Sequence, residues 1–249
     1  MMRMKIYTSE DVRVCLSNSC GLLIAASKLF KDKNLKPYSP ALVELAFEEL
    51  GKTICVYKMS ELGEEFLNKI KPNARNCETT FTEHDVKIEE MKEFIIYIRD
   101  KFSKKGLPLN NRDLIKDFPE KLGLNKKKQI RFKKETKNKY NITSETSKRV
   151  MEVINRSLDK DILKKDHSVI KNMREDSLYV KILSGKMIKN DKVDPNMISI
   201  IAFLVYSISS ALIGEVGELE FSESLILDAA YSLSVKSSLH KEIEGMLKR

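Results

Sequence analysis

The sequence predicts an all-α protein, a helical bundle, and three observations carry this prediction. Glycine and proline are scarce, with nine and six residues among 249. Charged residues make up 33% of the chain, and helix-favouring Leu, Ile, Lys and Glu dominate. Apolar residues recur in several long stretches at the three-to-four-residue spacing of an amphipathic helix. The length suits one core, so we expect a single helical domain over residues 1–249.

The first two helices are predicted over residues 9–31 and 39–59. Thr8 with Asp11 three residues later resembles a capping box at the start of the first helix. Ser39, which precedes a proline, is predicted to be the N-cap of the second helix. Because the connection between the two helices is short, we expect them to pack antiparallel.

The second predicted helix carries the motif Glu-Glu-Leu-Gly-Lys at residues 48–52. Its apolar residues form one broad stripe with Glu49 inside it, whereas Glu44 and Glu48 fall on the opposite side. A carboxylate within an apolar stripe must be paired, hydrogen-bonded or protonated. The spacing allows Lys52 to pair with Glu49 or with Glu48. The plain alternative is a surface ion pair between Glu48 and Lys52.

A further helix is predicted to start after Thr82 and to end before Gly106. Thr82 and Asp85 have the spacing of a capping box, which places His84 in the first turn. The positive end of a helix favours a neutral imidazole, and the free N–H groups there can bind a phosphate. Lys87 follows on the same side of the helix. The alternative is that His84 only caps the helix or packs against its neighbours.

Residues 107–142 are predicted to be a Lys-rich insertion within the domain. Residues 101–149 hold sixteen Lys and Arg against five Asp and Glu, so this segment accounts for the basic character of the chain. Basic side chains next to aromatic rings suit a nucleic-acid backbone and its bases. The candidate contacts are Lys127, Arg131, Lys133 and Lys134. The alternative is a solvated basic arm.

The last third of the chain predicts a small β-hairpin near residues 178–189 and two helices. Asp194 is expected to cap an uncharged helix over 197–213, and Ser222 is expected to start a final helix that ends near 247. The uncharged run reaches the length of a membrane span. Its serines and the glutamates that follow favour a buried core helix, and a membrane span is the alternative.

Several classes of protein lack support in this sequence. It has no phosphate-binding glycine loop, no zinc-protease motif and no nucleophile elbow. The four cysteines lack the spacing of a zinc site or a disulfide framework. We therefore expect no metal and no cofactor. The N-terminal residues contain no apolar segment, so we expect no signal peptide and a cytoplasmic protein.

Four blocks in this order resemble the AbiV-type abortive infection proteins, which are prokaryotic phage-defence proteins among the HEPN-like helical domains. The blocks are Glu-Glu-Leu-Gly-Lys at 48–52, Phe81-x-x-His84-x-x-Lys87, Arg174-Glu175 before Leu178-Tyr179-Val180, and Pro195. The resemblance implies an all-α HEPN-like bundle and a cytoplasmic defence role in which the activated protein shuts down the infected cell. It also implies a homodimer and RNA as a partner, with a phage protein as a candidate activator.

Two functions remain open at this point. The first is a phage-defence effector that acts on RNA or translation, with metal-independent RNA cleavage as its candidate activity. The catalytic candidates are His84, Glu49, Lys87 and Arg174, and the substrate-binding candidates outside the insertion are Lys52 and Tyr179. The second is a non-catalytic helical module that binds RNA or a protein, in which this cluster is structural. No arginine precedes a histidine by four to six residues, the spacing of many HEPN nucleases.

Overall fold

The computed structural model describes residues 8–62, 87, 91, 180–183, 186–189, 193–216 and 219–247. Its elements in chain order are α1 (Ser9–Lys31), the 3₁₀ turn η1 (Lys36–Tyr38), α2 (Ser39–Leu62), β1 (Val180–Leu183), β2 (Lys186–Lys189), α9 (Pro195–Val216), α10 (Glu223–Ser234) and α11 (Leu239–Leu247). Most described residues are helical, which confirms the all-α prediction. The predicted basic insertion, residues 107–142, lies outside the described residues.

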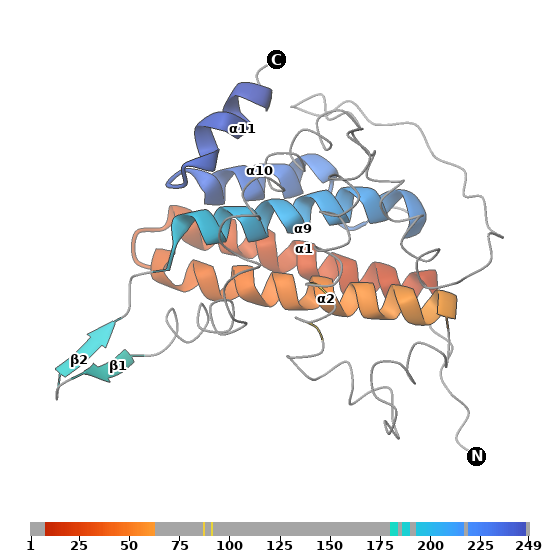
Figure 1. The fold of residues 1–249 in the computed structure, drawn as a ribbon, viewed down its shortest axis with the longest axis horizontal. Coiled ribbons are helices and arrows are strands. Elements are labelled where there is room, and N and C mark those ends of the chain that lie inside the picture. The colour runs from red at the N-terminus through yellow and green to blue at the C-terminus, as the bar shows by residue number, and fades with distance from the viewer. Residues whose placement is uncertain are drawn as a thin grey trace, which may run out of the picture.

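Within the described residues, α1, α2, α9 and α10 lie side by side as a helical bundle (Figure 1). α1 and α2 run antiparallel, as the short connection between them predicts, and share the most extensive helix contact in the described part. α9 and α10 form a second antiparallel pair, and both contact α1. α11 turns away from this bundle after α10 (Figure 1).

The start of α1 has the capping box that the sequence predicts. The Thr8 hydroxyl accepts the N–H of Asp11 at 3.4 Å, and the Thr8 N–H donates to Asp11 Oδ2 at 2.8 Å. Each side chain thus accepts a hydrogen bond from a backbone N–H that has no partner within the first helical turn. The helix then continues to Lys31, the predicted end.

The N-cap role predicted for Ser39 is wrong. η1 leads directly into α2, so Ser39 already has helical φ and ψ angles of −57° and −42°. Its hydroxyl instead donates to the carbonyl oxygen of Ala26 on α1, at 2.9 Å. Ser19 on α1 makes the converse contact, donating to the Ala46 carbonyl on α2 at 2.7 Å. These two buried hydrogen bonds tie the antiparallel pair together.

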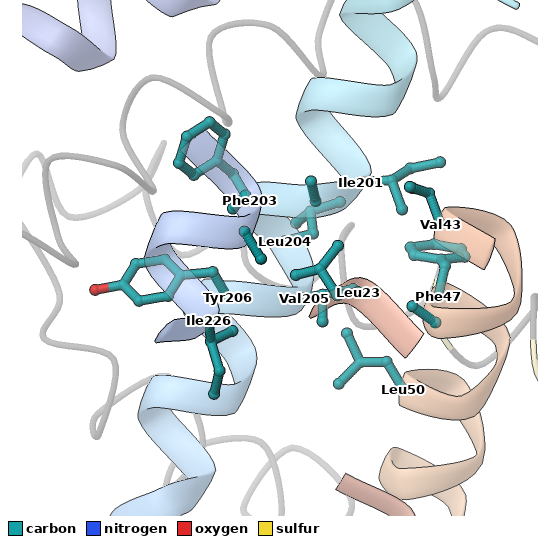
Figure 2. Close-up of a cluster of buried hydrophobic side chains, with 14 of the residues drawn as sticks. Leu23, Val43, Phe47, Leu50, Ile201, Phe203, Leu204, Val205, Tyr206 and Ile226 are labelled. Atoms are coloured by element: carbon teal, nitrogen blue, oxygen red, sulfur yellow. The ribbon is translucent and has the colours of Figure 1, made fainter. Parts of the chain in front are cut away.

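The helix α9, which carries no charged residue before Glu215, is a core helix, as the sequence favours. All of its residues from Met197 to Ser209 are buried. Val205 and Ile201 point toward Phe47 of α2, whereas Tyr206 points to the other side of α9 (Figure 2). A helix buried on every side carries apolar residues all round, which explains the absence of charge. Asp194 caps it, with Oδ1 accepting the N–H of Asn196 at 2.9 Å.

The single final helix predicted from Ser222 to 247 is two helices in the structure. Ser222 does cap α10, accepting the N–H of Leu225 at 3.4 Å. The break falls in a serine-rich turn after Ser234, where serine hydroxyl groups donate hydrogen bonds to backbone carbonyl oxygens. Ser234 donates to the Tyr231 carbonyl at 2.7 Å, and Ser237 donates to the Ser234 carbonyl at 2.8 Å.

The start of α11 is fastened to the start of α9. The side-chain oxygen of Asn196 accepts both the N–H and the hydroxyl of Ser238, each at 2.9 Å. His240 then approaches α10, with its Nδ1 atom 2.8 Å from the Ser234 hydroxyl and its ring over Tyr231 at 4.6 Å between centroids. These contacts set the direction in which α11 leaves the bundle.

The strands β1 and β2 pair antiparallel at the residues assigned to a hairpin by the sequence. Val180 lies opposite Lys189, and Leu183 lies opposite Lys186. The two strands stand apart from the helices and add no layer to the bundle (Figure 1).

Among the described helices, α1 is long and apolar enough to cross a membrane by length and composition alone. A core helix can have the same length and composition. α1 contacts α2, α9 and α10 along the bundle, and its first turn carries Glu10 and Asp11. These contacts make it a helix of the protein core.

A buried thiol joins α1 to α9. The sulfur of Cys20 lies 3.2 Å from the Ser209 hydroxyl oxygen and donates to it. Burial raises the pKa of Cys20 from its ordinary 9.0 to about 11, because the thiolate would lose its hydration, and the contact with Ser209 opposes the shift. Cys20 is therefore a neutral core residue near pH 7.

Candidate functional site

The candidate site lies where two of the four sequence blocks meet. Glu48 comes from the Glu-Glu-Leu-Gly-Lys block on α2, and Lys87 comes from the block that contains His84. The Lys87 ammonium lies 3.6 Å from Glu48 Oε2, and the two side chains are only 7% and 3% exposed. An ion pair shielded from water in this way is coupled much more strongly than a surface pair.

Gly51 allows the two segments to approach this closely. A Cβ atom at residue 51 would overlap the carbonyl oxygen of Lys87 and would lie 2.9 Å from the Lys87 carbonyl carbon. It would also lie 3.0 Å from Cγ of Met91, which is fully buried. The glycine therefore brings the backbone at Lys87 against α2, one turn from Glu48.

A second charged group lies beside this pair and is more accessible. Glu49 Oε2 lies 3.5 Å from the Lys52 ammonium, and the side chains are 18% and 35% exposed. The same oxygen accepts a hydrogen bond from Asn18 Nδ2 on α1, at 2.9 Å. Lys52 thus pairs with Glu49, one of the two partners that the sequence allows. The surface pair between Glu48 and Lys52 is not formed.

The burial predicted for the carboxylates of α2 is wrong in one respect. The periodicity places Glu44 and Glu48 opposite the apolar stripe, yet both are buried, whereas Glu49 is only half-buried. The reason is that α2 packs on α1 and α9 and also against Lys87 and Met91, so a second face is covered. Glu44 lies one turn before Glu48 on this second face.

The residues missed by sequence reasoning are Glu48, Glu44 and Asn18. One signal for the first two is present in the sequence. Residues 44, 48, 51 and 55 share one face of the helix, and two of them are the small residues Gly51 and Cys55. Small residues at helical spacing suit close packing of another segment, which buries whatever shares their face. Asn18 carries no comparable signal.

The charged residues on α2 and at Lys87 fall into a buried ion pair and a partly exposed ion pair. Glu48 and Lys87 neutralise each other's charge inside the protein, so they can hold their two segments in register. Lys52 and Glu49 are exposed enough to meet a ligand. Within the described residues, no group of three or more His, Cys, Asp and Glu side chains is placed to hold a metal ion.

The remaining predicted site residues lie outside the described part of the chain, so their roles stay predictions. They are His84, Arg174, Tyr179, Lys127, Arg131, Lys133 and Lys134.

Comparison with known protein families covers both sequence blocks of this site. The family model described as AbiV, of the HEPN_AbiV family, matches residues 9–201. The match contains both blocks that meet at the buried ion pair and ends within α9. No curated protein and no solved structure matches the chain significantly. A match over this share of the chain shows that the protein belongs to the AbiV family of HEPN-type abortive infection proteins.

Proposed function

We propose that this protein is an abortive-infection effector that acts on RNA, or on translation, in the cytoplasm. Membership of the AbiV family supports the defence role. The observation that carries the proposal further is the 3.6 Å contact between Lys87 and Glu48. It ties Lys87 to α2, and His84 stands three residues before Lys87 in the sequence. This supports the proposal that the acidic block and the histidine block form one site.

In the proposed ribonuclease reaction, His84 acts as general base on a ribose 2′-hydroxyl or as general acid for the leaving oxygen. Positioned acid–base groups of this kind contribute about 10²–10⁴-fold to the rate. Arg174 stabilises the negative charge that develops on the phosphate. Lys87 was also a candidate for that role, but its burial with Glu48 supports a positioning role.

The other predicted residues bind and orient the substrate in this proposal. Glu49 holds Lys52 toward the exposed side of α2, where its ammonium can reach a phosphate. Tyr179 is proposed to donate a hydrogen bond or to stack on a base. Further phosphates are proposed to meet the basic insertion at Lys127, Arg131, Lys133 and Lys134.

A second candidate function is an effector that binds RNA or a partner protein without cleaving it. The burial of Glu48 and Lys87 favours it, because a fully enclosed ion pair can serve stability alone. The charged cluster is then structural, and the effector stops growth by occupying its target.

The test is incubation of the full-length protein with labelled single-stranded RNA and with its 2′-deoxy analogue, in excess chelator. His84→Ala is the test variant, and His167→Ala is the matched control, because no role is predicted for that histidine. The ribonuclease proposal expects chelator-resistant cleavage of RNA only, since the reaction needs the 2′-hydroxyl. Cleavage should be lost in His84→Ala, which should melt as the wild type does, and kept in His167→Ala.

The binding effector gives a different pattern. It expects no cleavage by any of the three proteins and salt-sensitive RNA or partner binding that survives His84→Ala. Cleavage retained by His84→Ala would remove this histidine from the mechanism. Absence of both cleavage and RNA binding, in a protein that still arrests infected cells, would contradict the proposed action on RNA.

We also propose that the effector is a homodimer, as the family resemblance implies. Sedimentation velocity of the full-length chain tests this directly. A mass near twice 28.7 kDa is expected, and a monomer at micromolar concentration would contradict it.

A further inference from the structure

An asparagine outside the four sequence blocks contacts the partly exposed ion pair of α2. Asn18 lies on α1, and its Nδ2 atom donates a hydrogen bond to Glu49 Oε2 at 2.9 Å. The Lys52 ammonium lies 3.5 Å from the same carboxylate oxygen. One oxygen atom of Glu49 is therefore approached by two donors, one from each of two helices that lie side by side (Figure 1).

The two contacts with Glu49 Oε2 differ in length and therefore in strength. A charge-assisted N–H···O bond normally measures about 2.7–2.9 Å. The Asn18 contact has this length, whereas the Lys52 contact, at 3.5 Å, is an ion pair longer than a direct hydrogen bond. Lys52 is thus held near the carboxylate without donating a short hydrogen bond to it, and its side chain is 35% exposed. An ammonium group in this state can donate to a ligand.

The hydrogen bond from Asn18 explains why the ion pair is long. It holds the Glu49 carboxylate toward α1, whereas Lys52 follows Glu49 by three residues on α2. Side chains at this spacing are neighbours on the helix surface and can form a direct ion pair. Without Asn18, rotation of the Glu49 side chain brings the carboxylate within direct hydrogen-bond distance of Lys52. Asn18 therefore keeps the Lys52 ammonium available.

Lys52 lies at the border between the buried and the accessible parts of the candidate site. It follows Glu48 by about one helical turn, and Glu48 pairs with Lys87 inside the protein. Helical spacing thus places Lys52 between the face of α2 that Lys87 covers and the edge that carries Glu49. An available ammonium group at this border suits a phosphate oxygen of a substrate next to the site.

We propose that Asn18 is a positioning residue for the contact of Lys52 with an RNA phosphate. Asn18 draws the Glu49 carboxylate toward α1 and so leaves the Lys52 ammonium able to donate a charge-assisted hydrogen bond to the phosphate. This role rests on the proposed action on RNA, in which Lys52 is a phosphate contact. Asn18 carries no charge, so its effect on RNA binding passes through Glu49 and Lys52.

The first measurement is the dissociation constant of a 12-nucleotide single-stranded RNA as a function of salt concentration, with the full-length protein. Lys52→Gln removes one phosphate contact and should flatten the log–log slope by about 0.7. Asn18→Ala removes no charge, yet it should flatten the slope toward the Lys52→Gln value, because the released carboxylate captures Lys52. The matched control is Asn34→Ala, which changes an exposed asparagine between α1 and η1 and should keep the wild-type slope.

A second substitution separates positioning from a merely structural role. In the Glu49→Gln background no carboxylate is present to capture Lys52, so Asn18→Ala should leave the slope unchanged. Alanine has the better helix propensity at this exposed position of α1, so the variant should stay folded. A wild-type slope in Asn18→Ala, or an equal loss in both backgrounds, overturns the positioning role. RNA binding with an unchanged slope in Lys52→Gln overturns it too and leaves the action on RNA standing.

The second measurement needs no RNA. Acylation by acetic anhydride, followed by peptide mass spectrometry, reports how fast the Lys52 amine reacts. Lys52 should react more slowly in Asn18→Ala than in wild type, because a nearer carboxylate favours the charged, unreactive form of the amine. Asn34→Ala should not change the rate. Unchanged labelling in Asn18→Ala overturns the role of Asn18 whether or not RNA binds. Slower labelling in Asn18→Ala, with a wild type that binds no RNA, contradicts the proposed action on RNA and supports the hold of Asn18 on the ion pair.

Discussion

Gly51 lies directly against the main-chain carbonyl of Lys87, with no room for a methyl group between them. Glycine inside a helix costs about 0.5–1 kcal/mol relative to alanine, so its presence in the middle of α2 needs a compensating contact. The compensation is the close approach that lets Glu48 and Lys87 pair inside the protein.

Gly51→Ala should destabilise the protein in spite of the better helix propensity of alanine. Overpacking costs about 1–3 kcal/mol, and here the obstacle is backbone, which cannot rotate away. At roughly 2–4 °C per kcal/mol for a chain of this size, the melting temperature should fall by several degrees. Gly245→Ala is the matched control, because nothing lies within 4 Å of a Cβ atom there. It should be neutral or slightly stabilising, and equal effects of the two variants would contradict the close approach.

Breaking the buried ion pair should cost far more than breaking the accessible one. Glu48→Gln leaves the Lys87 charge enclosed, and Lys87→Met leaves the Glu48 charge enclosed, so each should cost about 3–5 kcal/mol in urea unfolding. The double variant removes both charges and should be more stable than the two single losses predict by addition.

Glu49→Gln is the matched control for the ion-pair series. Glu49 and Lys52 are partly exposed, and such pairs contribute about 0–1 kcal/mol. Similar losses for Glu48→Gln and Glu49→Gln would mean that water reaches both pairs. The same series informs function: if Lys87 positions the histidine block, Glu48→Gln should impair any RNA cleavage at temperatures where the variant is still folded.

Stability should fall with pH above about 9 because of Cys20. Its folded pKa, about 11, is raised above the ordinary 9.0, so the folded state holds its proton where the unfolded state loses it. The contribution is fully present below pH 9 and is lost as pH rises toward 11. At pH 10.5 the loss should reach about 2 kcal/mol.

Urea unfolding of wild type and Cys20→Ala at pH 8 and pH 10.5 isolates this term, since other titrating groups are common to both proteins. Cys20→Ala should lose less stability between the two pH values. Ser209→Ala removes the contact that lowers the thiol pKa, yet it should add at most about 0.2 kcal/mol to the loss, because the folded thiol is already mostly protonated at pH 10.5. Identical pH dependence in wild type and Cys20→Ala would show that the thiol is not enclosed in solution.

Asn196→Ala should release α11 with little effect on the rest of the bundle. It removes the acceptor of two hydrogen bonds from Ser238, whose net contribution is about 1–2 kcal/mol. Amide hydrogen exchange in residues 239–247 should speed up, whereas exchange in α1 should not change. Ser238→Ala loses only one of the two bonds and should give about half the effect. Uniform acceleration across the bundle would contradict a local tether.

The elements that the sequence predicts well are those whose signals are local. The capping box of Thr8 and Asp11 is complete within four residues, and it sets the start of α1. The uncharged run of α9 needs no partner to be identified as buried. The antiparallel packing of α1 on α2 follows from the short connection. In each case one segment contains enough information to choose its structure.

The predictions that fail depend on a partner distant in sequence. Ser39 has the residue type of an N-cap, but the Ala26 carbonyl on α1 competes for its hydroxyl. The break before α11 falls at local serines, but the position of α11 depends on Asn196, which holds Ser238 from another helix. The burial of Glu48 depends on Lys87, because periodicity within α2 describes one buried face and cannot reveal a second.

The order in which the helices leave the ribosome follows from the place of α9 in the chain. α1 and α2 are complete at Leu62, but α9, which covers them in the core, begins at Pro195. At about 5–20 residues per second, roughly 130 intervening residues take on the order of ten seconds to synthesise. During that time α9 is not yet available to pack on the apolar faces around Leu23 and Phe47. Until α9 is synthesised, these exposed apolar faces can bind chaperones or aggregate.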